Sequence, residues 1–131
     1  MLTLVVLPET LAICRLEHAA SVPEWAGDDI ATGNFISITR TRDELSIVRN
    51  ERDVPSGVKA DRGWRALKIE GPLDLSLTGV LASIAVPLAE ARINIFAIAT
   101  FDTDYVLVKA DRVAEAIGVL RSAGHRVTSD E

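Results

Sequence analysis

The stretch "EGPLDLSLTGVLASIAVPLAEARINIFAIATFDTDYVLV", which runs from Glu70 to Val108, decides the fold of the second half of the chain. Its middle predicts an amphipathic helix, because apolar residues recur on one helical face. These residues are Leu77, Val80, Leu81, Ile84, Leu88 and Ala91. Pro87 lies within this pattern and lacks a backbone donor, so we expect a kink or a break into two pieces there. The apolar runs on either side of "FDTD" predict two strands joined by a turn.

The segments that flank this stretch complete a recognisable order of elements. "WRALKIE" precedes it and predicts another strand. After it, Asp111 is predicted to cap a second helix, which Gly124 ends, and "HRVTSD" reads as a short last strand. The second half is therefore predicted to have the order β-α-β-β-α-β of the ferredoxin-like split unit.

The first half of the chain contains a hairpin similar to the later one. "FISITRT" and "ELSIVRN" alternate apolar and polar residues, which predicts two strands about a tight turn. A shift of 60 residues places Ile36 on Phe96 and Val48 on Val108 without a gap. We therefore predict two similar half-sized units, the first with its helices eroded.

The predicted fold class is α+β. It consists of two ferredoxin-like (βαββαβ) units, in which helices cover one face of antiparallel sheet. The first, degenerate unit is expected at residues 1–62, and the second at residues 63–131.

The helix-centred stretch resembles the opening of an ACT domain, the small amino-acid-binding regulatory module. The family pattern combines an apolar strand, a Gly-containing loop, an Asp-x-Pro-Gly turn and the apolar segments of a helix and the next strand. The segments that match are Thr78–Ile84, Leu88–Ala91 and Ile93–Ile95. Two positions depart from the pattern, because Thr78 stands where proline is usual and Ser76 stands where the acid is usual. "FDTDYVLVKAD" is similar to a subgroup with two ACT-like units in one short chain, which includes the Castor-type arginine sensors.

Composition narrows the classes of partner. The chain has 131 residues, 48% of them hydrophobic, and a net charge of −5. This charge, and the lack of a basic stripe with aromatics, argue against a nucleic-acid partner. No apolar run reaches the roughly 18 residues of a membrane span. Cys14, the single cysteine, cannot form an internal disulfide, and the start lacks the features of a signal peptide, so we expect a cytoplasmic protein.

The loop "GPLDLSLTG" contains the first group of candidate ligand-binding residues, which are Leu73, Asp74, Ser76, Thr78 and Gly79. The free N–H groups and positive dipole end of the following helix favour a carboxylate, such as that of a free amino acid. Ser76 or Thr78 can donate a hydroxyl hydrogen bond, and Gly79 permits a close approach to the backbone. The alternative is structural, with Asp74 or Ser76 capping the helix and Gly79 serving helix packing.

The turn "FDTD" contains the second group of candidates. Asp102 or Asp104 can accept hydrogen bonds from the ammonium of an amino acid or from a basic side chain. The resemblance to the Castor-type sensors implies that Thr100, Phe101 and Asp104 help to hold the ligand, and Phe101 can stack on a flat or cationic group. Two alternatives stay open: ordinary turn chemistry, and a divalent-ion or phosphate site built on the Asp-x-Asp spacing.

These observations predict a regulatory protein that binds a small molecule, an amino acid, and that has no catalytic activity and no cofactor. His18, His125 and Cys14 lie in no nucleophilic motif. The resemblance implies a homodimer, or a partner protein that performs the regulated activity. The alternatives are an assembly module without a ligand, an enzyme using Asp102 and Asp104, and a nucleotide- or RNA-binding sheet. The ligand hypothesis requires the helix-entry loop and the acidic turn to converge on one polar site.

Overall fold

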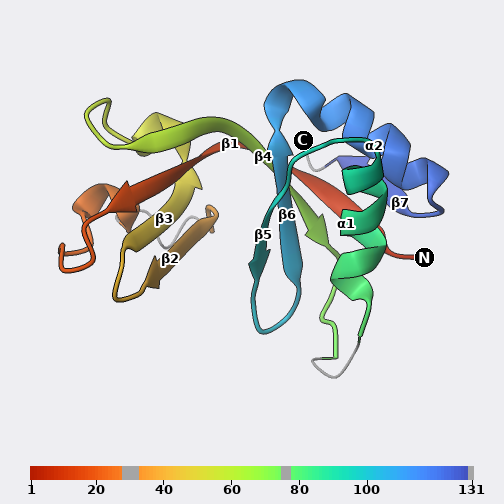
Figure 1. Ribbon diagram of the computed structural model, residues 1–131, viewed down its shortest axis with the longest axis horizontal. Coiled ribbons are helices and arrows are strands. Elements are labelled where there is room, and N and C mark those ends of the chain that lie inside the picture. The colour runs from red at the N-terminus through yellow and green to blue at the C-terminus, as the bar shows by residue number, and fades with distance from the viewer. Residues whose placement is uncertain (28–32, 75–77, 130–131) are drawn as a thin grey trace. The chain divides into compact units, whose positions relative to one another are not determined.

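The computed structural model describes residues 1–27, 33–74 and 78–129 (Figure 1). In chain order the elements are β1 (Thr3–Leu16), η1 (Glu24–Ala26), β2 (Ile36–Arg40), β3 (Leu45–Asn50), η3 (Glu51–Asp53), β4 (Ala60–Ile69), α1 (Val80–Glu90), β5 (Phe96–Ala99), β6 (Asp104–Lys109), η4 (Ala110–Arg112), α2 (Val113–Ser122) and β7 (Arg126–Ser129). The chain forms two compact units. Unit 1 comprises Met1–Glu9 and Arg65–Glu131, and unit 2 comprises Thr10–Trp64. The strands β1 and β4 therefore contribute residues to both units.

Unit 1 has the predicted order of elements, β-α-β-β-α-β, from β4 to β7. The strands β5 and β6 form an antiparallel hairpin, with Phe96 opposite Leu107 and Ala99 opposite Asp104. The last strand, β7, pairs with the start of β1 in parallel, from Thr3 opposite Arg126 onward. The mixed α+β class is as predicted, whereas the expectation of purely antiparallel sheet is wrong at this pair. The two strands run in the same direction, and β1 lies outside the β-α-β-β-α-β order that runs from β4 to β7.

Both helices of unit 1 pack on one face of its strands. Ile84 and Leu88 of α1 and Leu120 of α2 are buried in one cluster with alternate strand residues. The buried strand members are Leu4, Val6, Leu67, Ile69, Val106, Val108 and Val127. Period-two burial on the strands and a buried helical stripe are the patterns that the sequence indicated. No helix among the described residues has the length and apolar character of a membrane span.

Helix α1 continues through Pro87 without the break that its sequence suggested. A proline at this position cannot donate to the carbonyl of Ser83, four residues earlier. His125 Nε2 lies 3.1 Å from that carbonyl oxygen. His125 Nδ1 accepts from the backbone N–H of Leu2 at 3.1 Å, so Nε2 is the nitrogen that donates to Ser83. A side chain from the α2–β7 turn thus replaces the hydrogen bond that the proline removes.

Side-chain caps do not start either helix. The N-cap of α1 is Gly79, whose φ of 75° is readily adopted by glycine, and this residue makes no side-chain capping hydrogen bond. Asp74 is therefore not the N-cap residue of α1. The predicted cap of α2 by Asp111 is also wrong, because Asp111 lies inside η4 and α2 begins only at Val113. The chain enters α2 through a 3₁₀ turn, which moves the helix start beyond the reach of the aspartate.

Unit 2 contains four strand segments and no α-helix among the residues that the structure describes. The end of β1 pairs antiparallel with β3, and β2 pairs with β3 on its other side. Its core is a small cluster formed by Ala12, Cys14, Ala26, Leu45, Ile47 and Val54. The turns η1 and η3 occupy the places in the chain order that α1 and α2 hold in unit 1.

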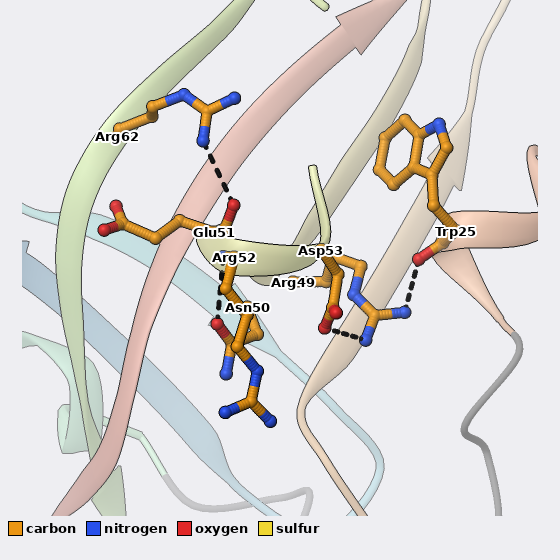
Figure 2. A network of polar contacts seen from close by, with 7 residues as sticks. All are labelled: Trp25, Arg49, Asn50, Glu51, Arg52, Asp53 and Arg62. Carbon is orange, nitrogen blue, oxygen red and sulfur yellow. Dashed lines mark hydrogen bonds and ion pairs between the residues drawn. The ribbon is translucent and has the colours of Figure 1, made fainter. Parts of the chain in front are cut away.

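A buried arginine joins the two short turns of unit 2 (Figure 2). Arg49 of β3 is only 2% exposed. Its Nη2 lies 2.6 Å from Asp53 Oδ2 in η3, and its Nη1 donates to the carbonyl oxygen of Trp25 in η1. Asn50 Oδ1 caps η3 by accepting from Arg52 N at 3.1 Å. Unit 2 therefore uses a polar network to hold its turns, where unit 1 packs apolar helices.

The two hairpins are alike, but the shift that relates their residues differs by one from the predicted 60. Arg40 pairs with Leu45, and Ala99 pairs with Asp104, so equivalent residues lie 59 positions apart and both corners have four residues. The predicted shift of 60 is wrong, and a one-residue error moves each side chain to the opposite face of a strand. In the observed register Arg49 corresponds to Val108, which lies in the core of unit 1.

Candidate functional site

A cavity of about 210 Å³ lies in unit 1, where the loop before α1 meets the corner between β5 and β6. It is lined by Leu73, Asp74, Val80, Ala99, Thr100, Phe101, Asp102, Thr103 and Asp104. The loop and the corner meet because β4 and β6 are neighbours in the sheet, so that the end of β4 lies beside the start of β6. The two joints predicted to converge therefore border one cavity.

Two hydrogen bonds and one close backbone approach hold the two joints together. The N–H of Leu73 donates to the carbonyl oxygen of Asp102 at 2.7 Å. The hydroxyl of Thr103 donates to the carbonyl oxygen of Ile69 at 2.5 Å. A Cβ at Gly71 would lie 3.0 Å from the Asp102 carbonyl oxygen and 3.3 Å from Thr103 Cβ, so the absence of a side chain permits the approach.

The corner itself is closed by Thr100. Its N–H donates to the carbonyl oxygen of Thr103 at 2.8 Å, and its hydroxyl also contacts that oxygen at 2.9 Å. The N–H of Thr103 lies 3.3 Å from Thr100 Oγ1. In the structure Thr100 has this structural role in the corner, and its predicted contact with a ligand stays a prediction.

Only some of the predicted site residues line the cavity. Six of them line the cavity, namely Leu73, Asp74, Thr100, Phe101, Asp102 and Asp104. Thr78 and Gly79 do not line it and stand instead at the exposed start of α1. Ser76 lies outside the described residues. Thr103 and Gly71 were missed, because the sequence gives no sign that the threonine between the two aspartates is buried or that this glycine lies against it.

The lining is acidic. Asp74, Asp102 and Asp104 supply three carboxylates, and no lysine, arginine or histidine is among the described lining residues. Carboxylates near one another favour a cationic group, such as an ammonium or guanidinium, through charge-assisted hydrogen bonds. Phe101 is 79% exposed at the rim, where its ring face is accessible to a cation. An anionic group would need the backbone donors at the start of α1.

Other chemistries find little support among the described residues. No three His, Cys, Asp or Glu side chains are grouped there as a metal site requires. Both ring nitrogens of His125 are engaged, by Leu2 and by Ser83. Cys14 is buried in unit 2, and burial raises the pKa of its thiol, which disfavours the nucleophilic thiolate.

Fold and cavity together define a class: a ferredoxin-like α+β module with a cavity beside the start of its first helix. The chain belongs to the ACT domain family, whose model matches residues 59–122. A second family model, which describes an N-terminal domain, matches residues 9–57.

Three similar proteins place the chain among its relatives. The cytosolic arginine sensor for mTORC1 subunit 1 of Mus musculus is 31% identical over 87% of this chain, which spans 40% of that relative's length. Protein Atu0741 of Agobacterium tumefaciens is 36% identical, with a TM-score of 0.90 over 99% of this chain and 94% of that one. The regulatory subunit of aspartate kinase from Thermus thermophilus shares the fold, at 16% identity and a TM-score of 0.57 over 88% of this chain and 93% of that one.

Proposed function

We propose that the chain is a regulatory module that binds a free amino acid in the cavity of unit 1 and performs no chemistry on it. The observation that supports this most directly is the meeting of three carboxylates with the start of α1 around one cavity. Asp102 and Asp104 accept hydrogen bonds from the cationic groups of the ligand, and the free N–H groups at the start of α1 donate to its carboxylate. Leu73, Asp74, Ser76, Thr78, Gly79, Thr100 and Phe101 complete the proposed contacts.

A basic amino acid is the preferred ligand. Its two cationic groups and one carboxylate match a cavity with three acids and one helix start. The relatives named as cytosolic arginine sensors support arginine as the first ligand to test, and they support a cytoplasmic location.

Binding acts by population shift, since the ligand favours the arrangement of subunits in which it makes more contacts. The chain pairs as a homodimer, or binds a partner protein that performs the regulated activity. The edge strand β5 offers a surface for such pairing.

Unit 2 is a degenerate ACT-like unit. The equal corner lengths of the two hairpins and the positions of η1 and η3 in the chain order support this.

A thermal-shift screen of the twenty amino acids, Mg²⁺ and ATP tests the proposal. A ligand at 100 times its Kd stabilises the folded chain by about 2.7 kcal/mol. Asp104→Asn should weaken binding of arginine by about tenfold to a hundredfold, because a hydrogen bond to a charged group contributes about 1.5–3 kcal/mol. Asp43→Asn is the control, because it makes the same chemical change in the corner of unit 2, at an aspartate that does not line the cavity.

The outcomes separate the classes. Stabilisation by an amino acid that Asp104→Asn abolishes and Asp43→Asn leaves unchanged supports the proposal. A response to Mg²⁺ or ATP alone contradicts it in favour of an enzyme. No response from a folded protein contradicts it in favour of an assembly module.

A further inference from the structure

We propose that Thr103, which no sequence motif singled out, is the positioning residue of this site, a role that rests on the proposed function. Thr103 is 5% exposed, although it stands in a corner between two aspartates. It lines the cavity but contributes no charge to it. Its hydrogen bonds instead join it to the end of β4, through Ile69, and to Thr100 in the corner.

The side chain of Thr103 fixes the corner to the strand that leads into the helix-entry loop. Its Oγ1 donates to the carbonyl oxygen of Ile69, the last residue of β4, at 2.5 Å. Its backbone is bonded within the corner through Thr100. One residue therefore connects the two joints that contribute the proposed ligand contacts.

The loop returns to the corner two residues after β4 has ended. Gly71 lies against the Asp102 carbonyl and Thr103 Cβ, and Leu73 N–H donates to that same carbonyl at 2.7 Å. We call Gly71, Leu73, Asp102 and Thr103 the latch. Because the latch uses backbone groups and a buried hydroxyl, it sets the separation between the corner and the loop without using the carboxylates.

Unit 2 shows what the same corner is like without the latch. In the register of the two hairpins, Thr103 corresponds to Glu44 and Asp102 corresponds to Asp43. The Asp43 carbonyl accepts from Arg15 Nη2 at 2.9 Å, a side chain that is 41% exposed. A long, half-exposed side chain fixes a carbonyl less firmly than a backbone amide does. The latch is therefore a feature of the hairpin that borders the cavity.

Rigid support of this kind matters because binding groups must be held within about 0.5 Å of productive geometry. The carboxylates of Asp102 and Asp104 flank Thr103 directly along the chain. Loss of the hydroxyl would leave the charge of both carboxylates unchanged and would loosen their placement relative to the helix-entry loop. The expected result is weaker binding with an intact fold.

The decisive comparison is Thr103→Val against Thr103→Ser. Valine keeps the size of threonine and removes the hydroxyl, whereas serine keeps the hydroxyl. Thr39→Val is the matched control, because Thr39 is exposed on β2. Amide hydrogen exchange at Leu73 reports the latch without a ligand, and calorimetry with arginine reports binding.

Thr103→Val should speed exchange at Leu73 at least tenfold and raise the Kd of arginine at least tenfold. Thr103→Ser and Thr39→Val should stay within about twofold of the wild type in both measurements, a factor that corresponds to a small change in free energy. If Thr103→Val fails to fold, Gly71→Ala tests the latch in its place. This variant disturbs the latch from the loop side and should also speed exchange at Leu73.

Exchange at Leu73 as slow as in the wild type, in a folded Thr103→Val or Gly71→Ala variant, would overturn the proposal. An unchanged Kd of arginine in Thr103→Val would also overturn it. Failure of serine to restore both readouts would also overturn it. If none of the twenty amino acids binds the wild type, the proposed function fails and the ligand-positioning role fails with it, while exchange at Leu73 still decides whether the latch exists.

Discussion

His125 Nε2 lies 3.1 Å from the carbonyl oxygen of Ser83, the acceptor that Pro87 leaves without its helical donor. The same ring accepts from the N–H of Leu2, so one side chain joins the start of β1, helix α1 and the α2–β7 turn. A proline inside a helix costs about 3 kcal/mol when nothing compensates for it. The histidine explains why α1 tolerates the proline.

A double-mutant cycle tests this relationship. His125→Ala should destabilise the wild type by about 1–3 kcal/mol, because a partly buried carbonyl loses its donor. In a Pro87→Ala background the N–H of residue 87 can bond to Ser83, so the same histidine change should cost less. Urea unfolding gives the coupling, expected at about 0.5–3 kcal/mol. Strictly additive changes in the free energy of unfolding would show that the histidine does not compensate for the proline.

Two glycine substitutions should change stability in opposite directions. An added Cβ at Gly118 in α2 meets no atom within 4 Å, so Gly118→Ala should stabilise the chain by about 0.5–1 kcal/mol through helix propensity. Gly71→Ala should destabilise it by about 1–3 kcal/mol, because its Cβ would lie 3.0 Å from backbone atoms of Leu73 and Asp102. Thermal unfolding of both variants checks the sign, and equal shifts in one direction would refute the packing at Gly71.

Burial should decide the value of two acid–arginine pairs of similar length. Asp53 Oδ2 lies 2.6 Å from the buried Arg49, and Glu115 Oε1 lies 2.7 Å from the exposed Arg112. Asp53→Ala should cost about 1.5–3 kcal/mol, since a buried guanidinium loses a charged partner. Glu115→Ala should cost far less, because water screens an exposed pair.

Chemical denaturation of the two variants measures this difference. The pair at Arg112 also predicts a pH dependence, because its hydrogen bond lowers the pKa of Glu115. The small stabilisation that it provides is present above the unfolded pKa and is lost as the pH falls through the folded value. A larger loss for Glu115→Ala than for Asp53→Ala would contradict the burial argument.

Cys14 should report opening of unit 2. Burial raises the pKa of its thiol, an effect that the charge of Arg62 partly offsets. A thiol reagent should therefore modify Cys14 in the native chain much more slowly than an exposed thiol, such as Thr39→Cys in a Cys14→Ser background. Equal labelling rates would show that the core of unit 2 is open to solvent.

The same shift sets the sign of a pH effect at alkaline pH. A pKa that is higher in the folded chain contributes stability that is fully present below the unfolded value and is lost as the pH rises through the folded value. Cys14→Ser should remove this alkaline loss, and unfolding measured across that range checks it.

Periodicity predicted the elements of unit 1, because the buried stripe of α1 and the alternation of β5 are local signals. The same method failed for the hairpin register. Residues 47–50 of β3 are all buried, so the strand gives no phase that distinguishes one register from the next. The helix starts failed for a different reason, since Gly79 and η4 depend on the path of the backbone rather than on capping side chains.

The meeting of the helix-entry loop with the acidic corner could be predicted, because it follows from the order of strands in the ferredoxin-like unit. The contacts that hold them could not. The burial of Thr103 and the close approach at Gly71 depend on the packing of the corner against Ile69, which lies 34 residues before Thr103. The pairing of His125 with Ser83 spans 42 residues and leaves no local trace in the sequence.

Equal corner length in the two hairpins makes their corners exchangeable parts. Residues 41–44 and 100–103 join strand pairs of the same register, and each begins with a threonine whose N–H donates to the fourth residue, at 2.9 and 2.8 Å. Transplanting one corner onto the other stem would leave the ladder of each hairpin in phase. A protein engineer could thus move or duplicate the acidic corner as a cassette, and a gene duplication that copied one hairpin could let the two copies diverge in role without disturbing either sheet.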